Sequence, residues 1–372
     1  MSNFSNTLLA SAALAACAAS AVAADASSQV FGAYNMTCAA NAQKYLSVPL
    51  TRSPAFAGKV ERALSASSEI VASGQPKFTA GGFVYNAGSQ TNRYYLKFTS
   101  GELEGAWFDI SNNSAYSVEI ETGSSDIAKV AAGDSFEIIP HWTLSTLFPN
   151  GAGFVKSTSK TVSLTSCTSV GKFTAQESDG SITTPVGVLS TPVKTYIYRQ
   201  YGKLSTWVEK SSPTVSRNDD IVEPNAVLLV KQPASAKASI TLCGKVPMCA
   251  TSVEIARLSE GSEQDNYVAV PTCTAVKLSA LTAALVESGA FEATGENASE
   301  PADTVVCCGE GSAEYFYMAS SSGGAWECDD AKLQTPAGDK VLKACSALKI
   351  RKSSKGTVEV RRIKIYPDYL SK

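Results

Sequence analysis

Few residues of this chain have the types and spacing that catalysis requires. His141 is the only histidine among 372 residues, so a Ser-His-Asp or Cys-His catalyst would have to use it. It lies at the end of an expected strand, where a structural or surface role is the usual one. Carboxylate pairs of the glycosidase kind remain open, but Asp219-Asp220 and Asp329-Asp330 both fall in expected turns. We therefore assign no catalytic residue and expect a non-enzymatic protein.

Basic side chains gather at the C-terminus. Residues 340–372 hold ten Lys or Arg against Glu359 and Asp368, whereas the whole chain carries a net charge of −2. Such a strip could bind acidic polysaccharide or an anionic envelope surface, with an affinity that falls as salt rises. The alternative is that these cations guard the exposed edge of a terminal β-hairpin. The candidate binding residues are Lys349, Arg351, Arg361, Arg362 and Lys364.

The N-terminus has the pattern of an export signal. A polar start leads into an alanine-rich apolar run, and Ala21-Val22-Ala23 suits signal peptidase, so we expect residues 1–24 to be removed. The alternative uses "LAAC" at residues 14–17, which fits a bacterial lipobox and would make Cys17 the lipid-bearing residue. Either way the protein is expected to be secreted, periplasmic or on the outer cell surface.

Cysteine is the other reactive residue type. Ten are present, and nine follow the predicted signal peptide. An exported chain meets an oxidising compartment, so disulfide bonds are expected, and the odd number leaves at least one thiol unpaired. A structural zinc site is the rival, but no CxxC pair and only one histidine are present, so we predict no metal and no cofactor. The disulfide candidates are Cys243, Cys249, Cys307, Cys308, Cys328 and Cys345.

The bulk composition is that of a globular protein. The chain is 44% hydrophobic and 18% charged, which allows a substantial core. Its 32 basic and 34 acidic residues lack the basic excess of a general nucleic-acid binder. No apolar run after the signal reaches the roughly 18 residues of a membrane-spanning helix. The candidate partners are therefore other envelope proteins or acidic polysaccharide, and the oligomeric state is left open.

Internal repeats organise the chain. "YIYRQYGKLSTW" at residues 196–207 returns as "YFYMASSSGGAW" at residues 315–326, and the offset of 119 or 120 persists through residues 231–247 and 351–367. "YLSVP" at 45–49 matches "YVAVP" at 267–271, and "TLSTLFPNGAGF" at 143–154 matches "KLSALTAALVESGAF" at 277–291. A longer relative, "YYLKFTSGELEGAW" at 94–107, suggests a third copy. Trp107, Trp207 and Trp326 could stack on sugars, but their repeated placement favours a core role.

The local patterns are those of short strands. Segments such as "YYLKF", "VLLV" and "IKIY" are rich in β-branched or aromatic residues and are separated by Gly, Ser, Asn and Pro. We predict an all-β fold of tandem small β-barrel or β-sandwich-like modules from diverged internal repeats, with one or two short helices. The modules are expected at residues 25–140, 141–250 and 251–372, the last being cysteine-rich with a basic C-terminal hairpin.

Three local features are also expected. Leu278, Leu281 and Leu285 fall on one face of a helix over residues 278–287. Gly133 and Asp134 are expected to form a tight turn before a strand. A change of hydrophobic phase predicts a bulge at Arg361-Arg362.

The first half of the chain resembles a known family. "LSVPLTRSPAFAGKVE", "YYLKFTSGELEGAWFDI" and "VAAGDSFEIIPHWTLSTLFPNGAG" are similar to segments of a paralogous family of exported, β-rich verrucomicrobial proteins of unknown function. The resemblance is best over residues 45–154, and the cysteine-rich last third departs from it. It implies bacterial export and a cell-envelope setting, and it implies no chemistry.

The sequence thus favours a secreted or cell-envelope structural or surface-binding protein. Two alternatives stay open. One is a secreted glycan-active hydrolase with a carboxylate pair, and the other is an adhesin-like binder of acidic glycans through the C-terminal basic hairpin.

Overall fold

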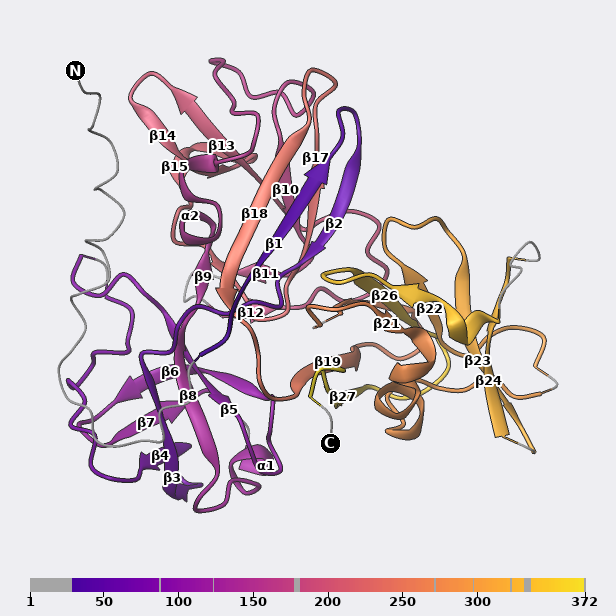
Figure 1. Ribbon diagram of the computed structural model, residues 1–372, viewed down its shortest axis with the longest axis horizontal. Coiled ribbons are helices and arrows are strands. Elements are labelled where there is room, and N and C mark those ends of the chain that lie inside the picture. The colour runs from indigo at the N-terminus through magenta and orange to yellow at the C-terminus, as the bar shows by residue number, and fades with distance from the viewer. Residues whose placement is uncertain are drawn as a thin grey trace, which may run out of the picture. The chain divides into compact units, whose positions relative to one another are not determined.

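The described chain is mostly β-structure with few and short helices, which confirms the predicted fold class (Figure 1). The computed structural model describes residues 29–370 apart from residues 87, 123, 177–180, 271, 297, 322 and 331–335. The described residues from Phe31 onward form one compact unit. The predicted signal peptide and Cys17 lie outside the described residues. No helix in the described part of the chain has the length and apolar character needed to cross a bilayer.

A closed six-stranded barrel is one module of the fold. Its strands neighbour one another in the order β3-β4-β7-β6-β5-β8, and β8 closes onto β3. Apolar side chains such as Leu96, Phe98 and Ile138 fill its interior and are fully buried. The predicted Gly133-Asp134 turn leads into β8, with Gly133 at φ 92°. The elements are β3 (Phe56–Leu64), β4 (Glu69–Ala72), β5 (Tyr94–Phe98), β6 (Trp107–Asn113), β7 (Ser117–Ile120), α1 (Ser124–Ile127) and β8 (Ser135–Pro140).

Two copies of one strand arrangement make up the rest of the unit, and we name them copy A and copy B. The strands of copy A are β1 (Phe31–Cys38), β2 (Gln43–Ser47), β9 (Trp142–Thr143), β10 (Ser169–Lys172), β11 (Ala175–Gln176), β12 (Ile182–Thr183), β13 (Lys194–Tyr201), β14 (Leu204–Glu209), β15 (Ser212–Ser216), β16 (Ile221–Val222), β17 (Val227–Lys231) and β18 (Ala238–Lys245). The strands of copy B are β19 (Thr251–Arg257), β20 (Gln264–Ala269), β21 (Val276–Lys277), β22 (Thr304–Cys307), β23 (Glu314–Ser320), β24 (Gly323–Cys328), β25 (Val341–Leu342), β26 (Ala347–Lys352) and β27 (Glu359–Ile365).

Strand pairing is the same in the two copies. The order β14-β13-β10-β17-β2 in copy A corresponds to β24-β23-β22-β26-β20 in copy B. The pairs β1-β18 and β9-β16 correspond to β19-β27 and β21-β25. Copy A adds β15 at one edge and the small pair β11-β12. The repeat predicted from sequence is therefore a repeat of topology as well.

The repeated aromatic hairpin has the same geometry in both copies. Tyr198 lies directly opposite Trp207, and Tyr317 lies directly opposite Trp326. The rings meet edge to face at centroid distances of 5.6 and 5.5 Å, with an interplanar angle of 79° in each case. Both tryptophans are buried, at 1% and 6% exposure, which confirms the predicted core role for these two.

The indole N–H of each tryptophan has an equivalent partner. Trp207 Nε1 donates to the carbonyl of Phe148 at 3.1 Å, and Trp326 Nε1 donates to Thr282 Oγ1 at 2.9 Å. Phe148 and Thr282 occupy the same position in the matching segments "LSTLF" and "LSALT". The partner has changed from a backbone carbonyl to a hydroxyl while the hydrogen bond has been kept.

The barrel is inserted into copy A. Strand β2 ends at Ser47 and β9 begins at Trp142, so the six barrel strands separate two consecutive strands of copy A. This explains why "YLSVP" precedes the barrel although its counterpart "YVAVP" belongs to copy B. The barrel hairpin β5-β6 does not share the aromatic register, because Trp107 lies opposite Lys97. The module boundaries predicted at residues 25–140, 141–250 and 251–372 remain a prediction. Strand β1 pairs with β18, and strand β2 pairs with β17.

The helical segments are short. In copy A, α2 (Leu144–Leu147) is capped by Thr143 and runs into η1 (Pro149–Gly151). In copy B, the helix predicted over residues 278–287 is found as η2 (Leu278–Leu281) followed by η3 (Ala283–Glu287), a 3-10 turn and then a π-helical turn. Leu278, Leu281 and Leu285 are all buried, as predicted. A further turn, η4 (Ala337–Asp339), precedes β25.

The predicted C-terminal hairpin and its bulge are wrong. Strand β26 pairs with β20 and β22, whereas β27 pairs with β19, so the two basic strands lie in different sheets. The register of β27 runs from Glu359 to Ile365 without a shift. Val358 and Val360 are more than half exposed, whereas Ile363 and Ile365 are buried. The two valines therefore face the solvent and the two isoleucines face the core, and this alternation requires no bulge.

The indole hydrogen bond of copy B can be tested by a double-mutant cycle with Trp326→Phe and Thr282→Val. We expect a coupling of about 0.5–1.5 kcal/mol in the free energy of unfolding, because that is the usual net contribution of one intramolecular hydrogen bond. Urea denaturation of the four proteins measures it. Independent, additive effects of the two changes would contradict this role of the indole N–H.

Candidate functional site

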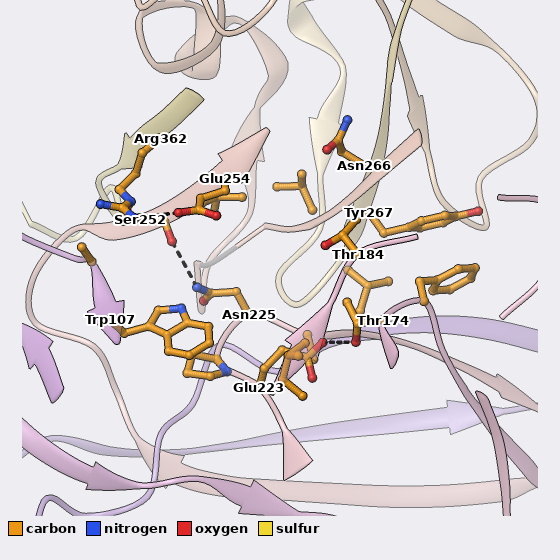
Figure 2. A pocket seen from close by; sticks show the side chains of 18 of the residues that line it. Trp107, Thr174, Thr184, Glu223, Asn225, Ser252, Glu254, Asn266, Tyr267 and Arg362 are labelled. Carbon is orange, nitrogen blue, oxygen red and sulfur yellow. Dashed lines mark hydrogen bonds and ion pairs between the residues drawn. The ribbon is translucent and has the colours of Figure 1, made fainter. Parts of the chain in front are cut away.

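A cavity of about 550 Å³ lies where the barrel, copy A and copy B meet, and we name it the central cavity. Its walls come from β6 and the segment after β7 in the barrel, from the segments that follow β10 and β16 in copy A, and from β19, β20 and β27 in copy B. Figure 2 shows side chains from all three parts around it. The labelled lining residues are Trp107, Thr174, Thr184, Glu223, Asn225, Ser252, Glu254, Asn266, Tyr267 and Arg362.

One wall of the central cavity is aromatic. Tyr267 on β20 stacks on Phe173 at a centroid distance of 3.6 Å and 15° between planes. Tyr45 on β2 stacks on both rings at 6.0 and 6.3 Å. Tyr45 and Tyr267 hold the same position in copies A and B, so the copies pack face to face through equivalent strands. Trp107 is half-buried and faces the cavity from the barrel side (Figure 2).

Glu223 is held ionised in the floor of the cavity. Its Oε2 lies 2.7 Å from Lys172 Nζ, and Thr174 Oγ1 donates to its Oε1 at 2.5 Å. Burial favours a raised pKa for Glu223, but the charge and hydrogen bonds of Lys172 and Thr174 outweigh burial, and the pKa lies below its ordinary value. This carboxylate can accept hydrogen bonds from a ligand but is unsuited to donate a proton.

Arg362 joins the barrel to copy B at the rim. Its guanidinium contacts Asp126 Oδ2 at 2.9 Å and Glu254 Oε1 at 2.6 Å, and it lies over the ring of Phe108 at 5.2 Å. Burial acts to lower the pKa of Arg362, but the two carboxylates outweigh it and raise the pKa, so the guanidinium stays charged. Asn225 Nδ2 donates to the carbonyl of Ser252 at 3.5 Å (Figure 2). This bond links copy A to β19, the strand of copy B that also carries Glu254.

Two carboxylates face each other across adjacent barrel strands. The register Ile110↔Ile120 places Asp109 opposite Glu121, and Glu121 N donates to the Asp109 carbonyl at 2.8 Å. Opposite residues of this kind have Cβ atoms about 4.5–5.5 Å apart. Both line the central cavity. Like charges directly opposite each other cost stability, so this pair is a functional candidate.

His141 supports Asp109 from within the protein. Its Nε2 lies 2.6 Å from Asp109 Oδ1, and its ring packs against Tyr95 and Trp107. Among the described residues, its buried Nδ1 has no hydrogen-bond partner. The tautomer with its hydrogen on Nε2 would donate a hydrogen bond to Asp109 and leave Nδ1 without need of a partner. The structural role of His141 stays a prediction.

The predicted basic strip is dispersed by the fold. Lys349 and Arg351 lie on β26, and Arg361, Arg362 and Lys364 lie on β27. Arg351 binds both oxygens of Asp265, at 2.8 and 3.1 Å, and Arg361 Nε contacts Glu359 at 3.0 Å. Of the five candidates, Arg362 alone is among the residues that line the central cavity. Neighbouring carboxylates therefore neutralise several of the basic residues that the sequence suggested would form one patch.

The predicted disulfide bonds are not formed, because all nine cysteines in the described part of the chain are free thiols. Cys243 is exposed on β18, where buried and exposed side chains alternate, whereas Cys249 is buried. Cys307 ends β22 and Cys328 ends β24, and β23 lies between them. One intervening strand separates the Cα atoms by about 9–10 Å, beyond the roughly 7 Å that a disulfide tolerates.

Among the remaining candidate thiols, Cys307 and Cys345 are buried and Cys308 is half-buried. Cys307 and Cys308 are neighbours in sequence, but they pack in different hydrophobic clusters. Burial raises the pKa of Cys307 to about 11 and the pKa values of Cys308 and Cys345 to about 12. At neutral pH these groups are protonated, and a protonated thiol is a poor nucleophile.

Most lining residues of the central cavity carry no local sequence signal. Glu223, Asn225 and Tyr267 come from turns and strands of different modules that only the fold brings together. Trp107 was grouped with Trp207 and Trp326 as core, yet it is the half-buried member of the three. The opposed Asp109 and Glu121 could be recognised only once β6 and β7 were paired.

No family model, curated protein or solved structure matches this chain.

Lys172→Met tests the buried ion pair. It leaves the Glu223 carboxylate buried without its cation, so we expect a loss of about 3–5 kcal/mol in the free energy of unfolding at pH 7. The double variant Lys172→Met/Glu223→Gln should recover part of this loss. Urea denaturation at pH 7 compares the three proteins, and a single variant as stable as wild type would contradict the ion pair.

The pH dependence of the same pair has a definite sign. Because the pKa of Glu223 is lowered in the folded state, its stabilising contribution is present above the unfolded pKa and is lost as pH falls through the folded pKa. Wild-type stability should therefore fall more steeply than that of Glu223→Gln below about pH 4.5.

Proposed function

We propose that the protein is a non-enzymatic glycan-binding protein, secreted or held in the cell envelope, and that the central cavity is its binding site. The observation that carries the proposal is the combination of a partly exposed Trp107 and the Phe173-Tyr267 stack with carboxylates and amides in one cavity. The export pattern at the N-terminus and the resemblance to exported verrucomicrobial proteins support the location.

The wall chemistry suits a hydroxyl-rich ligand. Aromatic rings offer flat apolar faces to the C–H face of a sugar, and fixed polar groups around them set its orientation. Trp107 and Tyr267 would supply the faces, and Glu223 and Asn225 would supply acceptors and donors for hydroxyl groups. Trp207 and Trp326 are buried and take no part.

The charge of the wall favours a neutral or amino sugar over an acidic one. Four carboxylates line the cavity, those of Asp109, Glu121, Glu223 and Glu254. Arg362 also lines it, and its guanidinium already contacts two carboxylates. An acidic glycan would meet like charge there. Binding of acidic glycans through exposed cations such as Arg361 remains the alternative, and high salt should abolish it.

Trp107→Ala should weaken glycan binding. Isothermal titration calorimetry would use matched oligosaccharides that differ in charge: neutral cello-oligosaccharides, cationic chitosan oligosaccharides and acidic oligogalacturonates. We expect neutral or cationic oligomers to bind the wild-type protein better than acidic ones, and Trp107→Ala to lose at least tenfold in affinity, which corresponds to about 1.4 kcal/mol.

Tyr116→Ala is the matched control, because Tyr116 is an exposed aromatic of the barrel that does not line the cavity. It should bind as the wild type does. Preferential binding of the oligogalacturonates that survives Trp107→Ala would overturn the proposal in favour of the basic surface.

A second candidate, a glycan hydrolase, is favoured by the opposed Asp109 and Glu121. In retaining glycosidases the two carboxyl groups are about 5–5.5 Å apart, and two acidic side chains directly opposite each other can adopt such a separation. Asp109, which accepts a hydrogen bond from His141, would attack the anomeric carbon, and Glu121 would protonate the departing glycosidic oxygen. Water would then release the sugar from Asp109, with Glu121 acting as base.

Reducing-end release separates the two candidates. From a binding protein we expect no new reducing ends after prolonged incubation with the three oligosaccharide classes. Release that persists in the purified wild type and is lost in Glu121→Gln would assign hydrolase activity to the pair. Glu119→Gln, two residues earlier on β7, is the matched control.

A further inference from the structure

A second cavity of about 360 Å³ lies on the barrel beside the central cavity, and we name it the barrel cavity. The two cavities share Asp109, Glu121 and Ser181 in their walls. We propose that they form one continuous groove and that the ligand is an extended oligosaccharide that occupies both. This inference rests on the proposed function of the central cavity and adds the length of the ligand.

The barrel cavity offers aromatic surfaces of its own. Tyr85 and Tyr94 line it and are partly exposed. The guanidinium of Arg93 lies over the Tyr85 ring at 4.4 Å, and Phe83 meets Tyr94 edge to face at 5.2 Å. These rings provide stacking surfaces beyond the Asp109-Glu121 pair, as Trp107 and Tyr267 do on the central side. Aromatic surfaces in both cavities match a ligand that repeats along its length.

The segment that carries the barrel-cavity aromatics is held in place by hydrogen bonds. Phe83 N donates to Asn113 Oδ1 at 2.9 Å, and Asn113 Nδ2 donates to the Thr79 carbonyl at 2.8 Å. Gln90 Nε2 donates to the Gly82 carbonyl at 2.7 Å. Asn113 is itself buried at the end of β6. The surface is therefore formed before a ligand arrives, which lowers the entropy lost on binding.

The part of the groove that the two cavities share determines which sugar units can bind in the middle of the ligand. Asp109 on β6 and Glu121, which directly follows β7, line both cavities. A sugar unit that crosses this point would present hydroxyl or amino groups to them, and a uronic acid would be repelled. The groove thus selects a neutral or amino-sugar chain rather than a polyuronic one.

The dependence of affinity on chain length tests the groove. The probes are cello-oligosaccharides and chitosan oligosaccharides of two to six units, titrated into the full chain by calorimetry. The wild type should bind the hexamer at least tenfold more tightly than the dimer. Tyr85→Ala should remove most of that gain and leave dimer binding unchanged, because Tyr85 lines the barrel cavity and is not among the residues that line the central cavity.

A second variant tests occupancy without removing a ring. Ser111 is an exposed residue of β6 that lines the barrel cavity, and Ser111→Trp should fill it and abolish the hexamer advantage. Tyr116→Ala is again the control and should keep the advantage. Hexamer and dimer of equal affinity in the wild type, or a hexamer advantage that survives both variants, would overturn the groove. Loss of all binding to every probe would instead overturn the proposed function.

Discussion

The stack of Tyr45, Phe173 and Tyr267 is the contact on which the arrangement of the modules depends. Equivalent tyrosines from the two copies both belong to it: Tyr267 stacks closely on Phe173, and the Tyr45 ring lies nearly parallel to both at about 6 Å. Small buried residues, Ala269 and Ala347, let the sheets approach around it. With this contact in place, the turn that carries Glu223 and Asn225 in copy A faces β19 and β20 in copy B, and the central cavity lies between them.

The barrel breaks this near-symmetry, and the cavity follows from that break. Because it is inserted in copy A between β2 and β9, it brings Trp107 and the Asp109-Glu121 pair to one side of the paired copies. Arg362 then fastens the barrel to copy B through carboxylates of both parts. A duplicated scaffold supplies rigidity, and a single inserted module supplies the residues that distinguish one face from the other.

The sequence was informative wherever a feature is local or repeated. The all-β class, the Tyr-Trp hairpins and the buried leucines of residues 278–287 follow from short-range patterns, and the structure confirms them. The disulfides and the terminal hairpin were wrong because both depend on which strands become neighbours: β23 separates Cys307 from Cys328, and β20 and β22 take the place beside β26 that β27 was expected to fill. The groove was not predictable, since its walls come from separate segments spread between residues 83 and 362 that no periodicity connects. The sequence also could not distinguish Trp107 from its buried relatives, because all three follow similar tyrosine-rich strands.

The insertion has a further consequence for how the chain acquires its structure. Phe31 on β1 pairs with Lys245 on β18, so the first strand to be made waits for more than two hundred later residues before its partner exists. The barrel strands, by contrast, all lie between residues 56 and 140 and can pair among themselves. Contacts so distant in sequence close slowly, and unpaired strand edges invite aggregation in the meantime. In copy B, which is continuous, Thr251 on β19 pairs with Ile365 on β27, about half that separation, so we expect copy A to fold more slowly and its early strands to need more protection during synthesis.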